Sequence, residues 1–130
     1  MPLDPRSQAS LAHVHPDLIK VVTLAYGDTR QPFEVIQGLR TLAEEKANVA
    51  KGTSQTLHSR HLPNAAGLAC AVDLAAIDRG HVSWSPLLYQ TIASAMKAAA
   101  NELSIPLEWG GDWKTLKDWG HFQLPWADYP

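Results

Sequence analysis

One stretch of this chain restricts its fold more than any other: the apolar run from Leu68 to Ile77, which a single carboxylate interrupts. A run of this length, followed by the turn-forming residues 78–80, predicts a buried strand. Side chains alternate between the two faces of a strand. One face, which we expect to lie in the core, consists of Cys70, Val72 and Leu74. The other consists of Ala69, Ala71 and Asp73. The small side chains of this second face predict room for a group that Asp73 can bind, although a solvated surface aspartate is the alternative.

Patterns typical of helices and short strands alternate irregularly around this run. Apolar spacing predicts a helix that begins after Pro16 and ends at Gly27, and another over 87–103 that begins at Ser85-Pro86. Thr41 and Glu44 have the spacing of a capping box, which predicts a helix up to Gly52. Further strands are predicted at 33–36, 82–84, 107–109 and 121–124. We therefore predict an α+β fold, a small single domain over 1–130 with a mostly antiparallel sheet, in which 1–12 is an irregular lead-in.

The composition restricts the possible partners. The 130 residues are 45% hydrophobic and 18% charged, which fits one compact globular domain. The formal net charge is −2, and no block of like charges indicates a nucleic-acid partner. No apolar run approaches the length that spans a bilayer, so we expect no stable membrane association. The single cysteine, Cys70, cannot form an intramolecular disulfide, and nothing demands more than a monomer.

Residues with metal-ligand chemistry occur in three separate segments. They are Ser59-Arg60-His61, the strand that carries Asp73, and Asp118-Trp119-Gly120-His121. Two imidazoles and a carboxylate are typical ligands of a catalytic zinc ion, which keeps a fourth position open for water. A second carboxylate could act as a general base. Each segment alone is more typical of a surface or structural role than of a metal site. Other histidines are also available as ligands: His13, His15, His58 and His81.

As an ordered set, four motifs resemble those of the M15 family of zinc peptidases. The motifs are Ser59-Arg60-His61, Ala71-Val72-Asp73-Leu74, Glu108-Trp109-Gly110-Gly111-Asp112-Trp113 and Asp118-x-x-His121-Phe122-Gln123-Leu124. The resemblance covers roughly His15 to Leu124. The family includes D-Ala-D-Ala carboxypeptidases and dipeptidases and the L-alanyl-D-glutamate endopeptidases that phages use as endolysins. The chain most resembles the endolysin branch. The resemblance implies a small α+β domain with an antiparallel sheet, shared with the Hedgehog signalling domain.

The resemblance also implies roles for individual residues. His61, Asp73 and His121 correspond to the three Zn²⁺ ligands, and Asp118 corresponds to the catalytic carboxylate. Arg40 corresponds to an arginine that faces the substrate and the developing negative charge, and Ser59 to a serine that contacts the substrate. The connection from His61 to Asp73 is longer than in the compact motif Ser-x-His-x-x-Gly-x-Ala-x-Asp, which leaves His58 as the alternative first ligand.

The function that this resemblance implies is hydrolysis of the L-Ala–D-Glu bond in the peptidoglycan stem peptide by metal-activated water. Two alternatives remain open: a D-Ala-D-Ala carboxypeptidase or dipeptidase, and a non-catalytic zinc-stabilised binding module. Residues 1–10 contain no hydrophobic stretch of the signal-peptide kind. We therefore expect synthesis in the cytoplasm of the host bacterium and action on the wall after the membrane is permeabilised.

Overall fold

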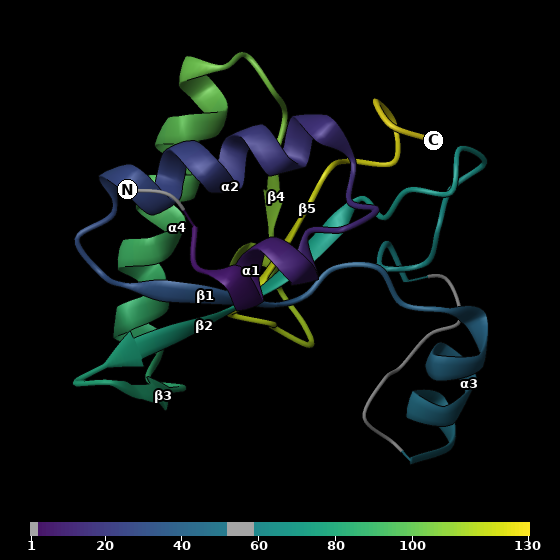
Figure 1. Ribbon diagram of the computed structural model, residues 1–130, viewed down its shortest axis with the longest axis horizontal. Coiled ribbons are helices and arrows are strands. Elements are labelled where there is room, and N and C mark those ends of the chain that lie inside the picture. Colours follow the sequence, from purple (N-terminus) through teal and green to yellow (C-terminus); the bar gives the residue numbers. More distant parts are fainter. Residues whose placement is uncertain (1–2, 52–58) are drawn as a thin grey trace.

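Five antiparallel strands form one sheet in the computed structural model, which describes residues 3–51 and 59–130 (Figure 1). The strands are β1 (Phe33–Gln37), β2 (Ala71–Asp78), β3 (His81–Ser83), β4 (Glu108–Trp109) and β5 (His121–Gln123). Their order is β1-β2-β5-β4, and β3 pairs with the end of β2 as a hairpin. Every strand pair is antiparallel, which confirms the predicted α+β fold.

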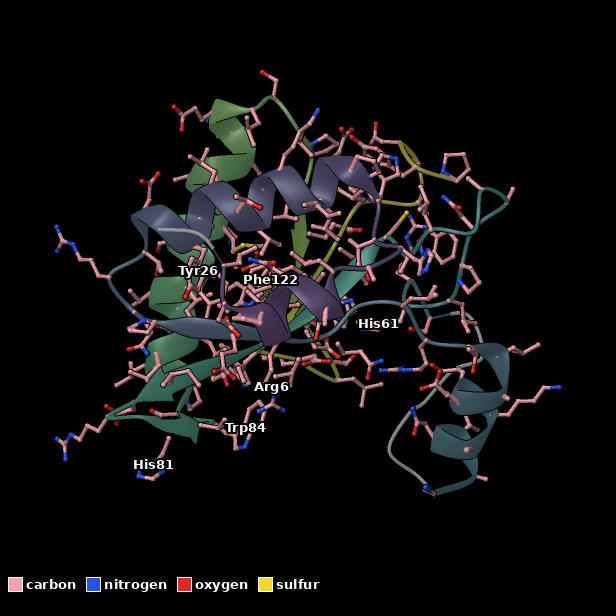
Figure 2. The ribbon with its side chains drawn as sticks, viewed as in Figure 1. Arg6, Tyr26, His61, His81, Trp84 and Phe122 are labelled. Carbon is pink, nitrogen blue, oxygen red and sulfur yellow. The ribbon has the colours of Figure 1, made fainter. Side chains whose placement is uncertain are left out.

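In the described ranges, four α-helices and one 3₁₀ helix accompany the sheet. They are α1 (Pro5–Ser10), α2 (Pro16–Asp28), α3 (Leu42–Lys51), α4 (Pro86–Glu102) and η1 (Gly110–Asp112). Helices α2 and α4 pack on each other, and their buried side chains join those of the sheet in one core. Phe122 of β5 is fully buried in this core, whereas Trp84 and His81 lie on the outside of the molecule (Figure 2). Helix α3 lies to one side of the sheet, beyond the end of β1 (Figure 1). No helix in the described ranges is long and apolar enough to cross a bilayer.

The prediction of an irregular lead-in over 1–12 is wrong, because Pro5–Ser10 forms α1. The Asp4 carboxylate caps this helix by accepting hydrogen bonds from the backbone N (3.1 Å) and the hydroxyl (2.6 Å) of Ser7. Ser7 in turn accepts a hydrogen bond from the Val35 backbone N at 2.9 Å. The helix therefore covers the outer edge of β1, and this tertiary contact stabilises a helix too short to form alone.

The other predicted elements are largely confirmed. The capping box is present: Glu44 N donates to Thr41 Oγ1 (3.1 Å), and Thr41 N donates to Glu44 Oε1 (3.0 Å). Helix α4 begins at Pro86 with Ser85 at the N-cap position, although the Ser85 side chain makes no capping hydrogen bond within the described chain. Helix α2 continues past Gly27 to Asp28.

The second face of the central strand is less open than predicted. Ala69 and Ala71 are both fully buried, and Ala69 precedes β2 in an isolated bridge to Val14. The side chain of Asp73 is 24% exposed. The accessible part of this face is therefore confined to the carboxylate.

Candidate metal centre

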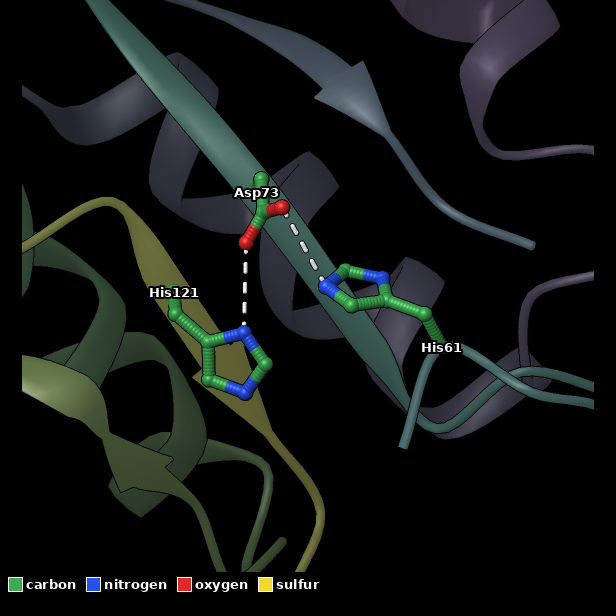
Figure 3. A group of neighbouring side chains, drawn as sticks. All are labelled: His61, Asp73 and His121. Atoms are coloured by element: carbon green, nitrogen blue, oxygen red, sulfur yellow. Dashed lines mark hydrogen bonds and ion pairs between the residues drawn. The ribbon is translucent and has the colours of Figure 1, made fainter. Parts of the chain in front are cut away.

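His61, Asp73 and His121 converge on one point of the sheet (Figure 3). Their ligand atoms lie within 4.8 Å of one another. His61 Nε2 is 3.2 Å from Asp73 Oδ2, and His121 Nδ1 is 3.2 Å from Asp73 Oδ1. Both histidines are buried. The three residues form a cluster that could hold a metal ion, with the carboxylate between the two imidazoles.

Strand register and a loop bring the three residues together. Asp73 of β2 lies directly opposite His121 of β5, so their side chains project from the same face. His61 comes from the segment that precedes β2. Its backbone carbonyl accepts a hydrogen bond from Arg40 N at 2.8 Å, and the Arg60 carbonyl accepts one from Cys70 N at 3.0 Å. Backbone hydrogen bonds on both sides therefore fix this segment against the sheet.

The contacts of the His61 ring indicate which of its two nitrogens carries the proton and which presents a lone pair to the cluster. Nδ1 lies 2.8 Å from the carbonyl oxygen of Gly38, and because a carbonyl only accepts, Nδ1 must carry the proton. The Nε2 atom of neutral His61 then presents a lone pair to the Asp73 carboxylate. This Nε2 is buried and has no hydrogen-bond partner among the described residues. A buried lone pair beside a carboxylate fits a bound cation.

Electrostatics keep the Asp73 carboxylate ionised. Burial raises its pKa, but the interactions with the neighbouring His121 and His61 rings outweigh burial and hold the pKa of Asp73 well below its usual range. Conversely, burial lowers the pKa of His121, but the interaction with Asp73 outweighs it and raises that pKa. The ionised carboxylate therefore carries a negative charge that a cation bound between the two imidazoles can compensate.

Arg40 lies next to the cluster and is held by a buried acid. Its Nη1 is 2.6 Å from Oε2 of Glu45, a fully buried residue of α3, and its Nη2 is 3.9 Å from Asp73 Oδ2. The Arg40 side chain is 13% exposed, and its buried Nε has no hydrogen-bond partner in the part of the chain that the structure describes. The guanidinium is thus oriented by Glu45 and keeps donor capacity near the cluster.

Asp118 lies in the segment that leads into β5. Its backbone N donates to the Gly110 carbonyl at 3.1 Å, and its own carbonyl accepts from His121 N at 3.3 Å. A Cβ on Gly110 would lie 2.3 Å from the Asp118 carbonyl oxygen, so this approach requires glycine. Burial, followed by the negative charge of Asp73, raises the pKa of Asp118. Burial and the charge of Asp73 thus both disfavour the ionised form of this carboxylate.

Ser59 and Trp113 each contact one of the two histidines. Ser59 Oγ accepts a hydrogen bond from the His61 backbone N at 3.1 Å. The Trp113 ring centroid lies 5.2 Å from that of His121, and the two planes are tilted by 48°. The alternative ligand His58 lies outside the described residues.

Known proteins share this architecture and sequence pattern. A family model described as phage L-alanyl-D-glutamate peptidase matches residues 1–122. The chain belongs to this family. It is 32% identical over 117 residues to an L-alanyl-D-glutamate peptidase of Escherichia phage T5, a match that covers 87% of this chain and 82% of the relative.

Two further relatives of this peptidase family extend the comparison. An L-alanyl-D-glutamate peptidase of Listeria phage A118 is 32% identical over 95 residues, which are 73% of this chain but 31% of the relative. The Serratia marcescens L-Ala D-Glu endopeptidase ChiX, known from a crystal structure, is 47% identical in sequence to this chain, and the two structures superpose with a TM-score of 0.90. That match covers all of this chain and 94% of the other. The fold and nearly the whole length are thus shared with an endopeptidase.

The residues that hold the candidate site side chains in place were not predicted from the sequence. Gly38, Glu45 and Gln123 contact His61, Arg40 and His121 respectively. Of these, Gln123 had a usable signal, because residues two apart on a strand share a face. Gly38 and Glu45 had none, since their contacts depend on how the loop and α3 fold back.

Proposed function

We propose that this chain is a zinc-dependent L-alanyl-D-glutamate endopeptidase, with residues 1–130 forming one catalytic domain of the M15 zinc-peptidase type. Its substrate is the bond between L-Ala and D-Glu in the stem peptide of peptidoglycan. Family membership and 47% identity to an endopeptidase of nearly equal length support the reaction. The observation that carries the metal assignment is the buried Nε2 of His61, which has no hydrogen-bond donor or acceptor partner in the described ranges and lies 3.2 Å from Oδ2 of the Asp73 carboxylate.

The donor set favours Zn²⁺ over harder cations. Two imidazole nitrogens and one carboxylate oxygen suit zinc, whereas magnesium and calcium prefer oxygen ligands alone. Three protein ligands leave a position open, as in catalytic zinc sites. A bound zinc ion would supply Lewis-acid chemistry, which acidifies water and polarises the scissile carbonyl.

The remaining residues complete the reaction in this proposal. Asp118 accepts the proton of the attacking water and passes it to the amine of D-Glu as the C–N bond breaks. Its raised pKa suits a group that must both accept and release a proton. Arg40, oriented by Glu45, donates hydrogen bonds to the oxyanion that forms on the carbonyl carbon of L-Ala. Ser59 lies beside His61, where its hydroxyl can donate to the substrate.

The biological setting in this proposal is phage lysis. The protein is stored as a monomer in the cytoplasm of the host bacterium and reaches the peptidoglycan once the membrane is permeabilised. No nucleic acid or membrane takes part in its activity.

Digestion of purified sacculi, with and without a chelator, tests this function. We expect new amino-terminal D-Glu in the zinc-loaded reaction and none after chelation. Release of free D-Ala or the D-Ala-D-Ala dipeptide instead would indicate a carboxypeptidase or dipeptidase. An intact sacculus in the presence of zinc would indicate a binding module.

A further inference from the structure

A line of side-chain hydrogen bonds runs from His121 to the edge of the sheet. His121 Nε2 lies 2.7 Å from Gln123 Oε1, and Gln123 Nε2 donates to Glu108 Oε1 at 3.1 Å. Glu108 of β4 is directly opposite Gln123 of β5 in the strand register. Gln123 is 8% exposed, whereas Glu108 is exposed. The line therefore links a buried imidazole with a carboxylate at the surface.

The chemistry of the three groups gives this line a direction. An ionised carboxylate can only accept hydrogen bonds, so Glu108 requires the amide nitrogen of Gln123 to face it. The amide oxygen of Gln123 must then face His121, where it accepts the Nε2 proton. With its proton on Nε2, the neutral imidazole presents the Nδ1 lone pair toward Asp73, 3.2 Å away.

If the Gln123 amide were flipped, the neutral His121 ring would carry its proton on the other nitrogen. The amide nitrogen of Gln123 would donate to Nε2 and require an acceptor there, so the proton of the neutral ring would move to Nδ1. That proton would point at Asp73, between the two candidate ligand atoms. A metal ion could then bind only after the ring changed its tautomer.

We propose that Gln123 and Glu108 are positioning residues that hold His121 as an Nδ1 metal ligand by fixing the orientation of one amide. This inference rests on the metal-ligand role of His121 in the proposed function. It assigns opposite ring nitrogens to the two histidines, since His61 faces Asp73 through Nε2 and His121 through Nδ1. Partners that orient a ligating histidine in this way typically contribute about 10–100-fold to metal affinity.

The test measures zinc affinity by chelator competition on the full chain, at one pH. Gln123→Met removes the acceptor while keeping a side chain of similar length, and we expect zinc to bind about 10–100-fold more weakly. The double variant Glu108→Gln/Gln123→Glu reverses the line, because a carboxylate next to His121 accepts both from the ring and from the new amide. We expect it to restore most of the lost affinity.

Gln37→Met is the matched control for this experiment. Gln37 of β1 is opposite Asp73 in the strand register, on the side of β2 away from β5. Its side-chain amide donates a hydrogen bond to the Leu39 carbonyl at 3.4 Å and contacts no imidazole among the described residues. We expect its zinc affinity to match that of the unmodified protein. An equal loss in Gln37→Met and Gln123→Met would overturn the proposal, and so would a loss that the double variant fails to restore.

The tautomer itself is measured on the unmodified protein, which keeps the proposal testable if Gln123→Met does not fold. Nitrogen-15 NMR of the zinc-loaded chain should show the His121 proton on Nε2 and the metal on Nδ1. A metal on Nε2 would overturn the inference. Absence of zinc binding by the unmodified protein would instead reject the proposed function, so the two failures are distinguishable.

Discussion

The two histidines beside Asp73 are held in different ways. His61 is on a loop, and a backbone carbonyl, that of Gly38, contacts its ring. His121 is on a strand, and a side chain, that of Gln123, contacts its ring. The position of His61 therefore depends on backbone segments that pack together from distant parts of the chain. The position of His121 depends on strand register and on hydrogen bonds that single substitutions can remove.

Two distant segments hold the His61 loop. Gly38 packs against α1 so closely that a Cβ would lie 2.1 Å from the Ser10 carbonyl oxygen. Arg60, which is 4% exposed, donates to the carbonyls of Leu124 (3.1 Å) and Tyr129 (2.5 Å). Its guanidinium also lies 3.9 Å from the ring centroid of Trp126. The amino-terminal helix and the carboxy-terminal segment thus both fix the neighbourhood of this candidate ligand.

Removal of either His61 or His121 should have the largest effect on zinc binding and activity. We expect His61→Ala and His121→Ala to weaken zinc binding by more than the ~100-fold that loss of a supporting partner can cost, and to abolish sacculus digestion. The measurement is zinc stoichiometry after dialysis, together with release of amino-terminal D-Glu. His81→Ala, at an exposed position of β3, is the control and should retain zinc and activity. Full zinc occupancy in either ligand variant would remove that residue from the site.

Asp118→Asn should separate chemistry from metal binding. The amide keeps the shape of the side chain but cannot accept the proton of water, so we expect kcat to fall about 10²–10⁴-fold. Zinc affinity should stay near that of the unmodified protein. Steady-state kinetics on a synthetic stem peptide, with zinc content measured in the same sample, check both expectations. Unchanged turnover would exclude Asp118 as the general base.

Gly38→Ala tests whether the packing of Gly38 against α1 stabilises the region around His61. The added methyl group meets the backbone of Ser10, and we expect a loss of about 1–3 kcal/mol in the free energy of unfolding. Gly27→Ala is the matched control, since no described atom lies within 4 Å of its added Cβ. Because Gly27 is the second-to-last residue of α2, where propensity counts less than in the interior, this change should raise the free energy of unfolding by at most about 0.5 kcal/mol. Equal stability of the two variants in urea titrations of the zinc-free protein would contradict the account.

Arg60→Lys tests the carboxy-terminal contact. Lysine keeps the charge but lacks the planar fork that reaches both carbonyls, so we expect a loss of about 1–2 kcal/mol from a poorly satisfied buried acceptor. Arg79→Lys serves as the control, because the Arg79 side chain is 92% exposed and its substitution should change stability by less than about 0.5 kcal/mol. Thermal unfolding of both variants compares them directly. A loss no larger at Arg60 than at Arg79 would show that the contact does not stabilise the loop.

The sequence was sufficient to predict the elements that carry strong local signals. The apolar run that contains Asp73, the capping box at Thr41 and the helix after Pro86 all appear in the structure. The three metal-ligand candidates came from the resemblance to a family, because local patterns do not show which of six histidines converge.

The contacts that the sequence did not predict depend on tertiary structure. Helix α1 is six residues long, and its stability depends on contacts with β1 that no local pattern encodes. Burial of Ala71 on the second face of β2 likewise depends on what packs above the sheet. The contacts of Arg60 with Leu124 and Tyr129 join residues more than 60 positions apart.

A crystal structure of the zinc-loaded protein, with anomalous scattering recorded at the zinc edge, shows directly whether His61, Asp73 and His121 bind the metal. We expect one zinc peak about 2.0–2.2 Å from His61 Nε2, an Asp73 carboxylate oxygen and His121 Nδ1. A zinc ion bound elsewhere on the chain, with none of these three side chains in contact with it, would contradict the proposed metal site.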